Sequence, residues 1–563
     1  MFRSIAGILT VFVTLQACGA PAPVSETASA PTLQKKQSSR RIREIVPTGR
    51  LPRDVRPLHY YLDLEVDPDQ ATFSGRARIE LSLKRRRHRI WMHGQDLKVR
   101  SVTVSGQRVG REHATWKVVN KTGLVALRFP KAMGPGKVNV EIEYSTTFAP
   151  GLAGLYRVEQ DKHNYAYTQF EPISARRAFP CLDEPAFKTP FDLSLTVESS
   201  DVAVANTPEL HSRDLGNGKK RVRFSTTRPM PTYLVAMAVG PFDVVQAQDI
   251  PSNERRNTKI PLRGITTKGK GKQIQFGLDK LPKLLTALED YFDIAYPYSK
   301  LDIIAIPDFK SGAMENVGAI TFREQYIMMD KQAASSAQLL TYYAVMTHEL
   351  AHQWFGNLVT MYWWHDLWLN ESFATWMAAR TLDELMPEFN MKMQELRAVH
   401  AAMDADSLVS ARQIRQPIRS DHDIENAFDA ITYTKGGAIL SMFESWMGAE
   451  AFRDGIRRYL RAHEDGNART EDFLTALVGE KNKEVAASFS SFLHQPGVPL
   501  IESELECKGR EAKLRVTQNA IRLAAQRHEE ANVGRFRCVY VLLRAIAGKL
   551  RGNVFFSPKL RKS

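Results

Sequence analysis

The sequence predicts an α+β multidomain protein in which an antiparallel β domain precedes a mostly helical domain. Two observations predict this order. Apolar residues recur at every second position in several runs within residues 51–240, and at helical spacing within residues 241–498. A chain of 563 residues with a 43% hydrophobic share can form more than one core. The chain also lacks an apolar run of about 18 residues, which argues against a polytopic membrane protein.

Residues 1–17 have the pattern of a signal peptide. A positive start at Arg3 precedes an apolar stretch over residues 5–15, which is too short to span a membrane. The segment LQAC then resembles a bacterial lipobox, and we predict that Cys18 is lipidated as the first mature residue. The alternative is an ordinary signal peptide cleaved after Ala17. The lipobox predicts a lipid-anchored protein of the bacterial cell envelope, in the outer membrane or facing the periplasm.

Residues 19–50 are rich in Ala, Pro, Ser and Thr and then in basic residues, which predicts a flexible tether. The β domain follows over residues 51–240. Its clearest strand signals are HYYLDLEV (59–66), RARIELSL (76–83), KVNVEIEY (137–144) and FDLSLTVE (191–198). Their alternation predicts antiparallel strands with one face solvated. The basic run at 84–89 lacks interleaved aromatic residues, so we interpret it as a solvated turn rather than a nucleic-acid site.

Helix signals dominate residues 241–498. The expected helices cover residues 336–357, 367–387, 436–447, 449–463 and 470–479. Gly356 suits the position after a helix, and Pro387 is expected to stop the second helix. Thr470, with Asp472 nearby, has the pattern of an N-terminal cap.

The residue pattern and composition of the chain change after Pro499. A hairpin-like stretch at 501–516 indicates the start of a further β domain, which we place at residues 499–518. Residues 519–563 contain 10 Lys and Arg but 2 Glu, so they carry +8 of the net charge of +15. We predict that this basic tail comes from a truncated or frame-shifted gene. A short natural form with a basic tail is the alternative.

The segment His348-Glu349-Leu350-Ala351-His352 has the spacing of a metal site. Two histidines four residues apart lie on one face of a helix and can bind one metal ion. Glu371, with eighteen residues between it and His352, can supply a third ligand from the next helix. Three protein ligands leave one coordination position open, as metal-assisted hydrolysis requires. The alternative is a pair of histidines packed under aromatic residues.

The HELAH segment, the eighteen-residue spacing and NESFA (370–374) resemble the gluzincin metallopeptidases. GAMEN at 312–316 narrows the resemblance to the aminopeptidase N family. Further similar stretches lie at 51–66, 168–191 and 427–442, so that the resemblance covers roughly residues 50–517. It implies a thermolysin-like (gluzincin) α/β catalytic domain over 241–498, between the β domain and an incomplete β-sandwich start.

The resemblance also implies the catalytic roles. His348, His352 and Glu371 would hold one Zn²⁺ per chain. Glu349 would act as the general base, and Tyr433 would stabilise the oxyanion that develops beside the metal. The residues alone would favour a packing role for this tyrosine, at the start of a helix.

The same resemblance implies how the substrate binds. Glu315 and Glu171 would bind the free α-ammonium, although each alone would be interpreted as a solvated surface carboxylate. The other residues implied in substrate binding are Gly312, Ala313, Met314, Asn316 and Gln169. The first two would present backbone groups along the substrate, and the glutamine would line the first side-chain pocket.

The sequence therefore predicts a zinc-dependent aminopeptidase acting on peptides with a free N-terminus, bound to a membrane through Cys18 and to no nucleic acid. Asp366 and Asn370 are expected either to orient the histidines or to cap helices. One alternative is a zinc endopeptidase, against which Glu171 and Glu315 argue. The others are a non-catalytic envelope lipoprotein with a basic binding surface and a catalytically impaired truncated form.

Overall fold

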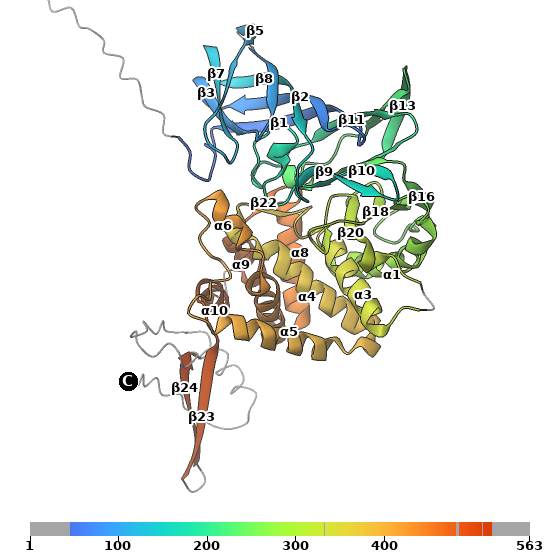
Figure 1. Cartoon of the computed structure of the whole chain (residues 1–563). Helices are drawn as coiled ribbons and strands as arrows, with labels where there is room; N and C mark the ends of the chain where they lie inside the picture. The colour runs from blue at the N-terminus through green and yellow to red at the C-terminus, as the bar shows by residue number, and fades with distance from the viewer. Residues whose placement is uncertain (1–45, 108, 331–332, 480–482, 509–510, 521–563) are drawn as a thin grey trace, which may run out of the picture. The chain divides into compact units, whose positions relative to one another are not determined.

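The computed structural model describes residues 46–107, 109–330, 333–479, 483–508 and 511–520 (Figure 1). The predicted signal peptide, Cys18, most of the tether and the tail beyond residue 520 lie outside the described residues. A mostly β part precedes a helix-rich part in Figure 1. The predicted α+β class and the order of its two main parts are confirmed.

An eight-stranded sheet forms the main framework of the β part. In spatial order its strands are β13 (Glu209–Gly216), β14 (Lys219–Phe224), β11 (Phe191–Glu198), β1 (Val55–Glu65), β2 (Thr72–Leu83), β8 (Gly136–Thr147), β4 (Lys98–Gly106) and β5 (Val109–His113). Buried and less buried residues alternate along β11, as the period of two predicts. All neighbours are antiparallel except β1 and β11, which pair in parallel because a long connection separates them.

Two smaller sheets complete the β part. One has the order β3 (Arg87–His93), β7 (Leu124–Met133) and β6 (Thr115–Val118). The other has the order β12 (Val202–Ala205), β15 (Met237–Gly240), β10 (His163–Gln169) and β9 (Gly154–Gln160). All seven residues of the segment from Tyr165 to Glu171 are buried or half-buried. The end of β10 therefore carries Gln169 and, two residues later, Glu171 into the interior.

A mixed five-stranded sheet begins the helix-rich part. Its order is β16 (Asp243–Gln246), β17 (Leu262–Thr266), β18 (Leu301–Ile306), β20 (Ala319–Arg323) and β19 (Ala313–Met314). The three middle strands are parallel, and the two edge strands are antiparallel to their neighbours. Every residue of β18 is buried, as is typical of a strand covered on both faces. The GAMEN segment thus lies on an edge strand.

Ten α-helices lie in the described part of the chain. They are α1 (Gln275–Phe292), α2 (Glu324–Ile327), α3 (Ser336–Ala351), α4 (Trp368–Leu385), α5 (Met391–Asp406), α6 (Asp421–Glu425), α7 (Gly436–Met447), α8 (Ala449–His463), α9 (Thr470–Val478) and α10 (Lys483–His494). Two short parallel strands, β21 (Thr360–Met361) and β22 (Asn467–Ala468), link the segment after α3 to the segment before α9. Buried aromatic side chains, with Trp354, Trp368 and Phe373 among them, form the core between the helices.

Two predicted helix details are wrong. Helix α3 ends at Ala351 rather than beside Gly356, because the chain turns back at once below the second histidine. Gly356 lies in that turn at φ +118°, and a Cβ there would lie 3.2 Å from a side-chain nitrogen of His352. At α9 the cap position is Arg469, whose backbone N–H donates to Asp472 at 2.8 Å.

The predicted start of a β-sandwich is a two-stranded hairpin of β23 (Pro499–Lys508) and β24 (Glu511–Ala520). The strands pair antiparallel over their whole length. Ile501 and Leu505, which share one face of β23, are exposed, so this face has no covering layer among the described residues. None of the helices that the structure describes combines the length and the apolar character needed to span a bilayer.

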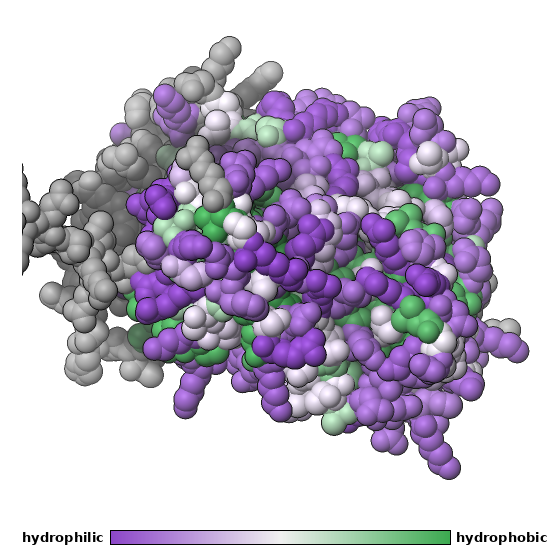
Figure 2. Space-filling model, turned by 90° about the horizontal axis from the view of Figure 1, so that it is seen from above, coloured by the Kyte–Doolittle hydropathy of each residue, from purple (hydrophilic) through white to green (hydrophobic). Residues whose placement is uncertain are grey.

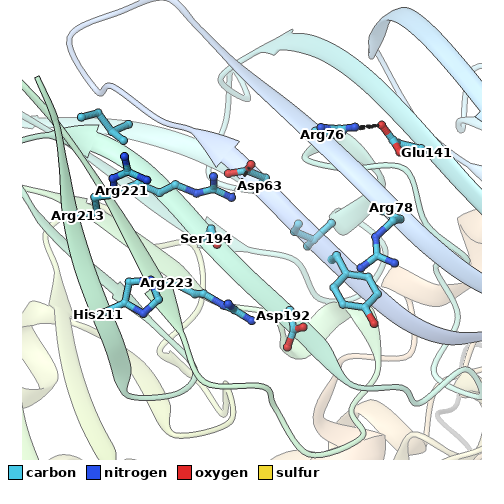
Figure 3. A pocket seen from close by; sticks show the side chains of 13 residues that line it. Asp63, Arg76, Arg78, Glu141, Asp192, Ser194, His211, Arg213, Arg221 and Arg223 are labelled. Atoms are coloured by element: carbon cyan, nitrogen blue, oxygen red, sulfur yellow. Dashed lines mark hydrogen bonds and ion pairs between the residues drawn. The ribbon is translucent and has the colours of Figure 1, made fainter. Parts of the chain in front are cut away.

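The outer face of the eight-stranded sheet carries charges of both signs. Hydrophilic side chains cover most of the face shown in Figure 2. A pocket of about 540 Å³ lies on this sheet (Figure 3), and in it Arg76 contacts Glu141 and Arg221 contacts Asp63. Within the predicted basic turn at 84–89, Arg85 binds Asp54 at 2.7 Å. These three arginines are therefore paired with carboxylates.

Candidate active site

Helix α3 presents both histidines of the HELAH segment to one point. A capping box fixes its start, in which Ser335 and Gln338 bond to each other's backbone N–H groups. At its other end, Nε2 of His348 and Nε2 of His352 lie 2.9 Å apart. Each of these nitrogens lies 3.3 Å from a carboxylate oxygen of Glu371. Three donors at this spacing suit one zinc ion at the usual bond length of about 2 Å.

Helix α4 supplies the carboxylate of this group and also holds the segment with Tyr433. A Cβ at Gly436 would lie 2.0 Å from Oγ of Ser372, so only glycine allows α7 to start so close to α4. The Ser372 hydroxyl donates to the carbonyl of Thr432 at 2.6 Å. Residues 431–435 form a π-helical turn there, a feature that is frequent at functional sites. Tyr433 consequently packs nearly parallel to the ring of His348, with centroids 6.0 Å apart.

The histidines are oriented by groups that the sequence did not indicate. Nδ1 of His352 lies 2.8 Å from the backbone carbonyl of Phe355, which fixes the ring with Nε2 inward. Thr375 Oγ1 lies 3.4 Å from Nδ1 of His348. Of the two roles left open for Asp366, the orienting one finds no support, since its carboxylate binds Arg415 instead. Asn370 likewise bonds to a residue other than these histidines.

The buried amide of Asn370 donates to the hydroxyl of Tyr233 at 3.2 Å. The Asp366 carboxylate accepts a hydrogen bond from Thr470 at 2.7 Å, so it links α9 to the segment before α4. Neither residue stands at the cap position of the helical turn or helix it belongs to. Both therefore act in the packing around the site rather than on the ring nitrogens of the histidines.

Three further glutamates, Glu171, Glu315 and Glu349, gather around the metal-binding group. The first two have carboxylate oxygens within 4.8 Å of each other and of Glu371. Glu315 lies 3.9 Å from His352, and Glu349 belongs to the same helical turn as the histidines. Among the described residues, one buried oxygen of each of the three has no hydrogen-bond partner. Such oxygens are positioned to accept bonds from a bound ligand.

The electrostatics of this cluster favour a bound cation. Burial, together with the neighbouring carboxylates, raises the pKa of Glu171 and of Glu349 well above their usual range. Burial raises the pKa of Glu315 to about 7. Burial would also raise the pKa of Glu371, but the adjacent histidines outweigh it and hold this pKa at about 2. A metal ion and a substrate ammonium would both relieve the repulsion among these groups.

The Tyr433 phenol is kept protonated. Burial, and then the charge of Glu371, raises the pKa of this hydroxyl well above its usual value. A protonated phenol can donate a hydrogen bond to a developing oxyanion. The side chain lines the same pocket as the histidines.

A pocket of about 710 Å³ brings most of the predicted site residues together. Of these, it is lined by Gln169, Glu171, Gly312, Ala313, Met314, Glu315, His348, Glu349, His352, Glu371 and Tyr433. The Gln169 amide contacts the sulfur of Met314 at 3.4 Å, on the side of the pocket formed by β10 and β19. The metal-binding group, the paired carboxylates and the tyrosine therefore share one cavity.

Asn316 is the exception among the predicted residues. It does not line the pocket, and its amide donates to Thr321 at 3.2 Å. Its carbonyl accepts from the N–H of Ala319, which closes the turn into β20. The carbonyl of Gly312 accepts from the N–H of Arg323. The predicted substrate contact of Asn316 thus finds no support, whereas both residues of the edge strand β19 line the pocket.

Two residues that follow the metal-binding segment, Gln353 and Asn357, were not predicted from the sequence to belong to the site. The amide of Asn357 donates to the carbonyl of Glu315 at 2.7 Å, and that of Gln353 donates to the same carbonyl at 3.1 Å. These two hydrogen bonds link the GAMEN segment to the end of α3. The sequence places both amides near the motif, but only the tertiary structure shows which carbonyl they reach.

Comparison with known proteins places the chain beside peptidases. Residues 56–234 match the description Peptidase M1 N-terminal domain, and residues 276–492 match Peptidase family M1 domain. Aminopeptidase M1-D of Oryza sativa subsp. japonica is 36% identical over 474 residues, which are 84% of this chain and 53% of the relative. Aminopeptidase 2, mitochondrial, of Saccharomyces cerevisiae is 35% identical over 471 residues, 82% of this chain and 48% of the relative. The chain thus spans about half the length of these relatives.

The predicted bacterial cell-envelope location is contradicted. Similar proteins are found in Oryza sativa subsp. japonica, Arabidopsis thaliana, two yeasts and Caenorhabditis elegans. The lipid anchor at Cys18 was inferred from a short local pattern, and short patterns recur by chance in sequences of any origin. A membrane attachment of this chain has no support beyond that pattern, and neither has the alternative of a basic binding surface.

Proposed function

The chain belongs to peptidase family M1, the aminopeptidase N family, and we propose that it is a zinc-dependent aminopeptidase that removes N-terminal residues from peptides. One observation carries the proposal. A three-ligand metal-binding group lies in a single pocket with a pair of carboxylates, each of which has an oxygen unpartnered within the described chain. The metal-binding group suits hydrolysis of an amide, and the pair of carboxylates suits binding of a positively charged α-amine.

His348, His352 and Glu371 would hold one Zn²⁺, because their donor atoms converge within 3.3 Å. Bound zinc would activate a water molecule and polarise the scissile carbonyl. Glu349 takes the proton of the attacking water on a carboxylate oxygen and passes it to the leaving amine.

The other residues bind and orient the substrate. Glu171 and Glu315 bind the α-ammonium and so place the first peptide bond, rather than a later one, beside the metal ligands. Tyr433 donates its phenolic proton in a hydrogen bond to the oxygen of the carbonyl as negative charge develops there. Gln169 and Met314 line the pocket for the first side chain, and the edge strand β19 lies along the peptide backbone. A zinc endopeptidase would not need the paired carboxylates.

We propose domain limits at 51–240 for the β domain, 241–498 for the catalytic domain and 499–518 for the partial β-sandwich. The catalytic pocket uses both of the first two, since Glu171 comes from the β domain and the metal ligands from the helices. An activity assay should therefore use the full chain.

The test is an assay of the zinc-loaded chain with aminoacyl amides and their N-acetylated counterparts. Only the free amines are expected to be hydrolysed, with loss of turnover on chelation and in the variant Glu349→Gln. The variant Glu384→Gln, at an exposed position on α4, is the matched control. Absence of turnover from a folded chain with bound zinc would contradict the proposal. Equal turnover of the acetylated substrates would indicate an endopeptidase.

A further inference from the structure

The catalytic pocket extends beyond the metal-binding group, between α3, α4 and α5. On α4 the lining residues continue from Glu371 through Thr375 to Ala379, about 12 Å along the helix at a rise of 1.5 Å per residue. On α5 the lining residues are Met391, Gln394, Glu395 and Ala398, which share one face of that helix. The extension is therefore part of the same cavity as the metal-binding group.

This extension lies on the side toward which the leaving part of the peptide points. The carboxylates proposed to bind the amine, Glu171 and Glu315, stand at the ends of β10 and β19, whereas the extension is lined by residues of α3, α4 and α5. A peptide held at those carboxylates by its amine has its scissile bond at the metal ligands. Its second residue must then continue along the helical side, past Val345 on α3 and Ala378 on α4.

Glu395 supplies a negative charge to this otherwise mostly apolar extension. Its side chain is half-buried, and it makes no hydrogen bond or ion pair with any residue that the structure describes. The nearby acids are already partnered, since Asp383 lies 3.5 Å from Lys392 and Glu444 lies 3.1 Å from Arg380. Burial, and then these two acids, raises the pKa of Glu395, so an arriving cation would be favoured at this point.

We propose that Glu395 makes the enzyme prefer peptides whose second residue is lysine or arginine. The aliphatic stem of such a residue packs against Val345, Ala378 and Met391, and its charged end meets the carboxylate. This inference rests on the proposed function, because it names the substrate class of the same site. The preference does not follow from the metal-binding motif, since Glu395 lies on α5 and none of the three proposed metal ligands comes from that helix.

The test compares kcat/KM for the tripeptides Ala-Lys-Gly and Ala-Gln-Gly with the full zinc-loaded chain. Lysine is expected to be favoured about tenfold, as for a charge-assisted hydrogen bond. Glu395→Gln should bring the ratio of the two rates close to one, and Glu395→Lys should reverse it. Glu395→Asp should keep part of the preference. The control Glu388→Gln, at an exposed position outside the pocket, should leave the ratio unchanged.

The outcomes separate this inference from the proposed function. Turnover of an alanine fluorogenic amide, which lacks a second residue, tests the function alone. If both tripeptides are hydrolysed and the ratio of their kcat/KM values is the same in the wild type and in Glu395→Gln, the proposed role of Glu395 is overturned. If no substrate is hydrolysed, the proposed function fails, and calorimetric binding of the two tripeptides to the Glu349→Gln variant decides the preference. About tenfold tighter binding of the lysine peptide supports it, and equal affinity overturns it.

Discussion

The side-chain amide of Asn357 donates a hydrogen bond to the backbone carbonyl of Glu315 at 2.7 Å. This bond links the turn after α3 to Glu315, which directly follows β19 and is one of the two carboxylates proposed to bind the amine. It sets the distance between the two halves of the site, because both partners are packed in the buried core. In the proposed mechanism, a small displacement there would move the substrate amine away from the proposed metal ligands.

We expect Asn357→Ala to lower kcat/KM for free-amine substrates about tenfold, mainly through KM, because the carboxylate loses its alignment. The zinc content should stay at one per chain, since no metal ligand is changed. Steady-state kinetics and metal analysis measure the two effects. The control Asn164→Ala removes a bond from an exposed amide to Asp69, away from the pocket residues. Unchanged kinetics in Asn357→Ala would refute the positioning role.

Loss of the carboxylate ligand should weaken metal binding. Glu371→Gln is expected to lower zinc affinity at least about a hundredfold, more than the loss of an outer-sphere partner does. Competition with a chromophoric chelator measures the affinity. Zinc should also raise the unfolding temperature of the wild type, because it binds the folded chain in preference to the unfolded one. An equal rise in Glu371→Gln would show that the metal binds elsewhere.

Removing the phenolic hydroxyl should affect the rate rather than binding. Tyr433→Phe is expected to reduce kcat about a hundredfold with KM almost unchanged, because the hydroxyl acts on charge that develops in the transition state. Steady-state kinetics on one aminoacyl amide measure both constants. A change confined to KM would instead place the tyrosine in ground-state binding.

The paired carboxylates should determine the recognition of the free amine. Glu315→Gln and Glu171→Gln are each expected to reduce kcat/KM for free-amine substrates about a hundredfold, since each removes a charged partner of the buried ammonium. The acetylated substrates should stay poor. Parallel assays of the two substrate series provide the measurement. Discrimination that survives in both variants would mean that other groups bind the amine.

A buried ion pair beside the site should control stability at acid pH. Burial alone would raise the pKa of Asp366, but His365 and Arg415 outweigh it and hold that pKa below its usual value. A lowered carboxyl pKa stabilises the fold above the unfolded-state pKa of about 4, and this contribution is lost as pH falls through the folded-state pKa. Asp366→Asn should cost about 3 kcal/mol at pH 7.

The difference in unfolding free energy between the wild type and Asp366→Asn should therefore shrink as the pH falls below about 4. Chemical denaturation from about pH 3 to pH 7 measures it. Glu384→Gln on the exposed face of α4 provides the matched control and should change stability little. A difference that stays constant with pH would contradict the assignment of this charge.

Several strands and helices followed from local patterns. The run FDLSLTVE became β11 with the predicted bounds, because alternation of apolar residues leaves one face for the core. Helices α7 and α8 also begin and end where the pattern indicated. The end of α3 was misplaced, because the helix stops at Ala351 and Gly356 lies within the turn that follows it rather than directly after the helix.

The bacterial location was wrong for a related reason. Four residues ending at Cys18 carried that prediction together with the lipid anchor, and no packing or spacing constraint supported them. The metal-binding segment, by contrast, combines a helical spacing with a third ligand at a fixed separation. Patterns that impose several geometric conditions are therefore the better guides to function.

The sequence by itself determined the residue types of the site, because two histidines at helical spacing and a glutamate on the next helix must lie close wherever two such helices pack. Only the tertiary structure decided how far the carboxylates of Glu171 and Glu315 lie from the three proposed metal ligands. It also decided that Asn316 turns away and that Glu395 enters the pocket. These relations join segments far apart in the chain, and they depend on packing and desolvation, which no local pattern encodes.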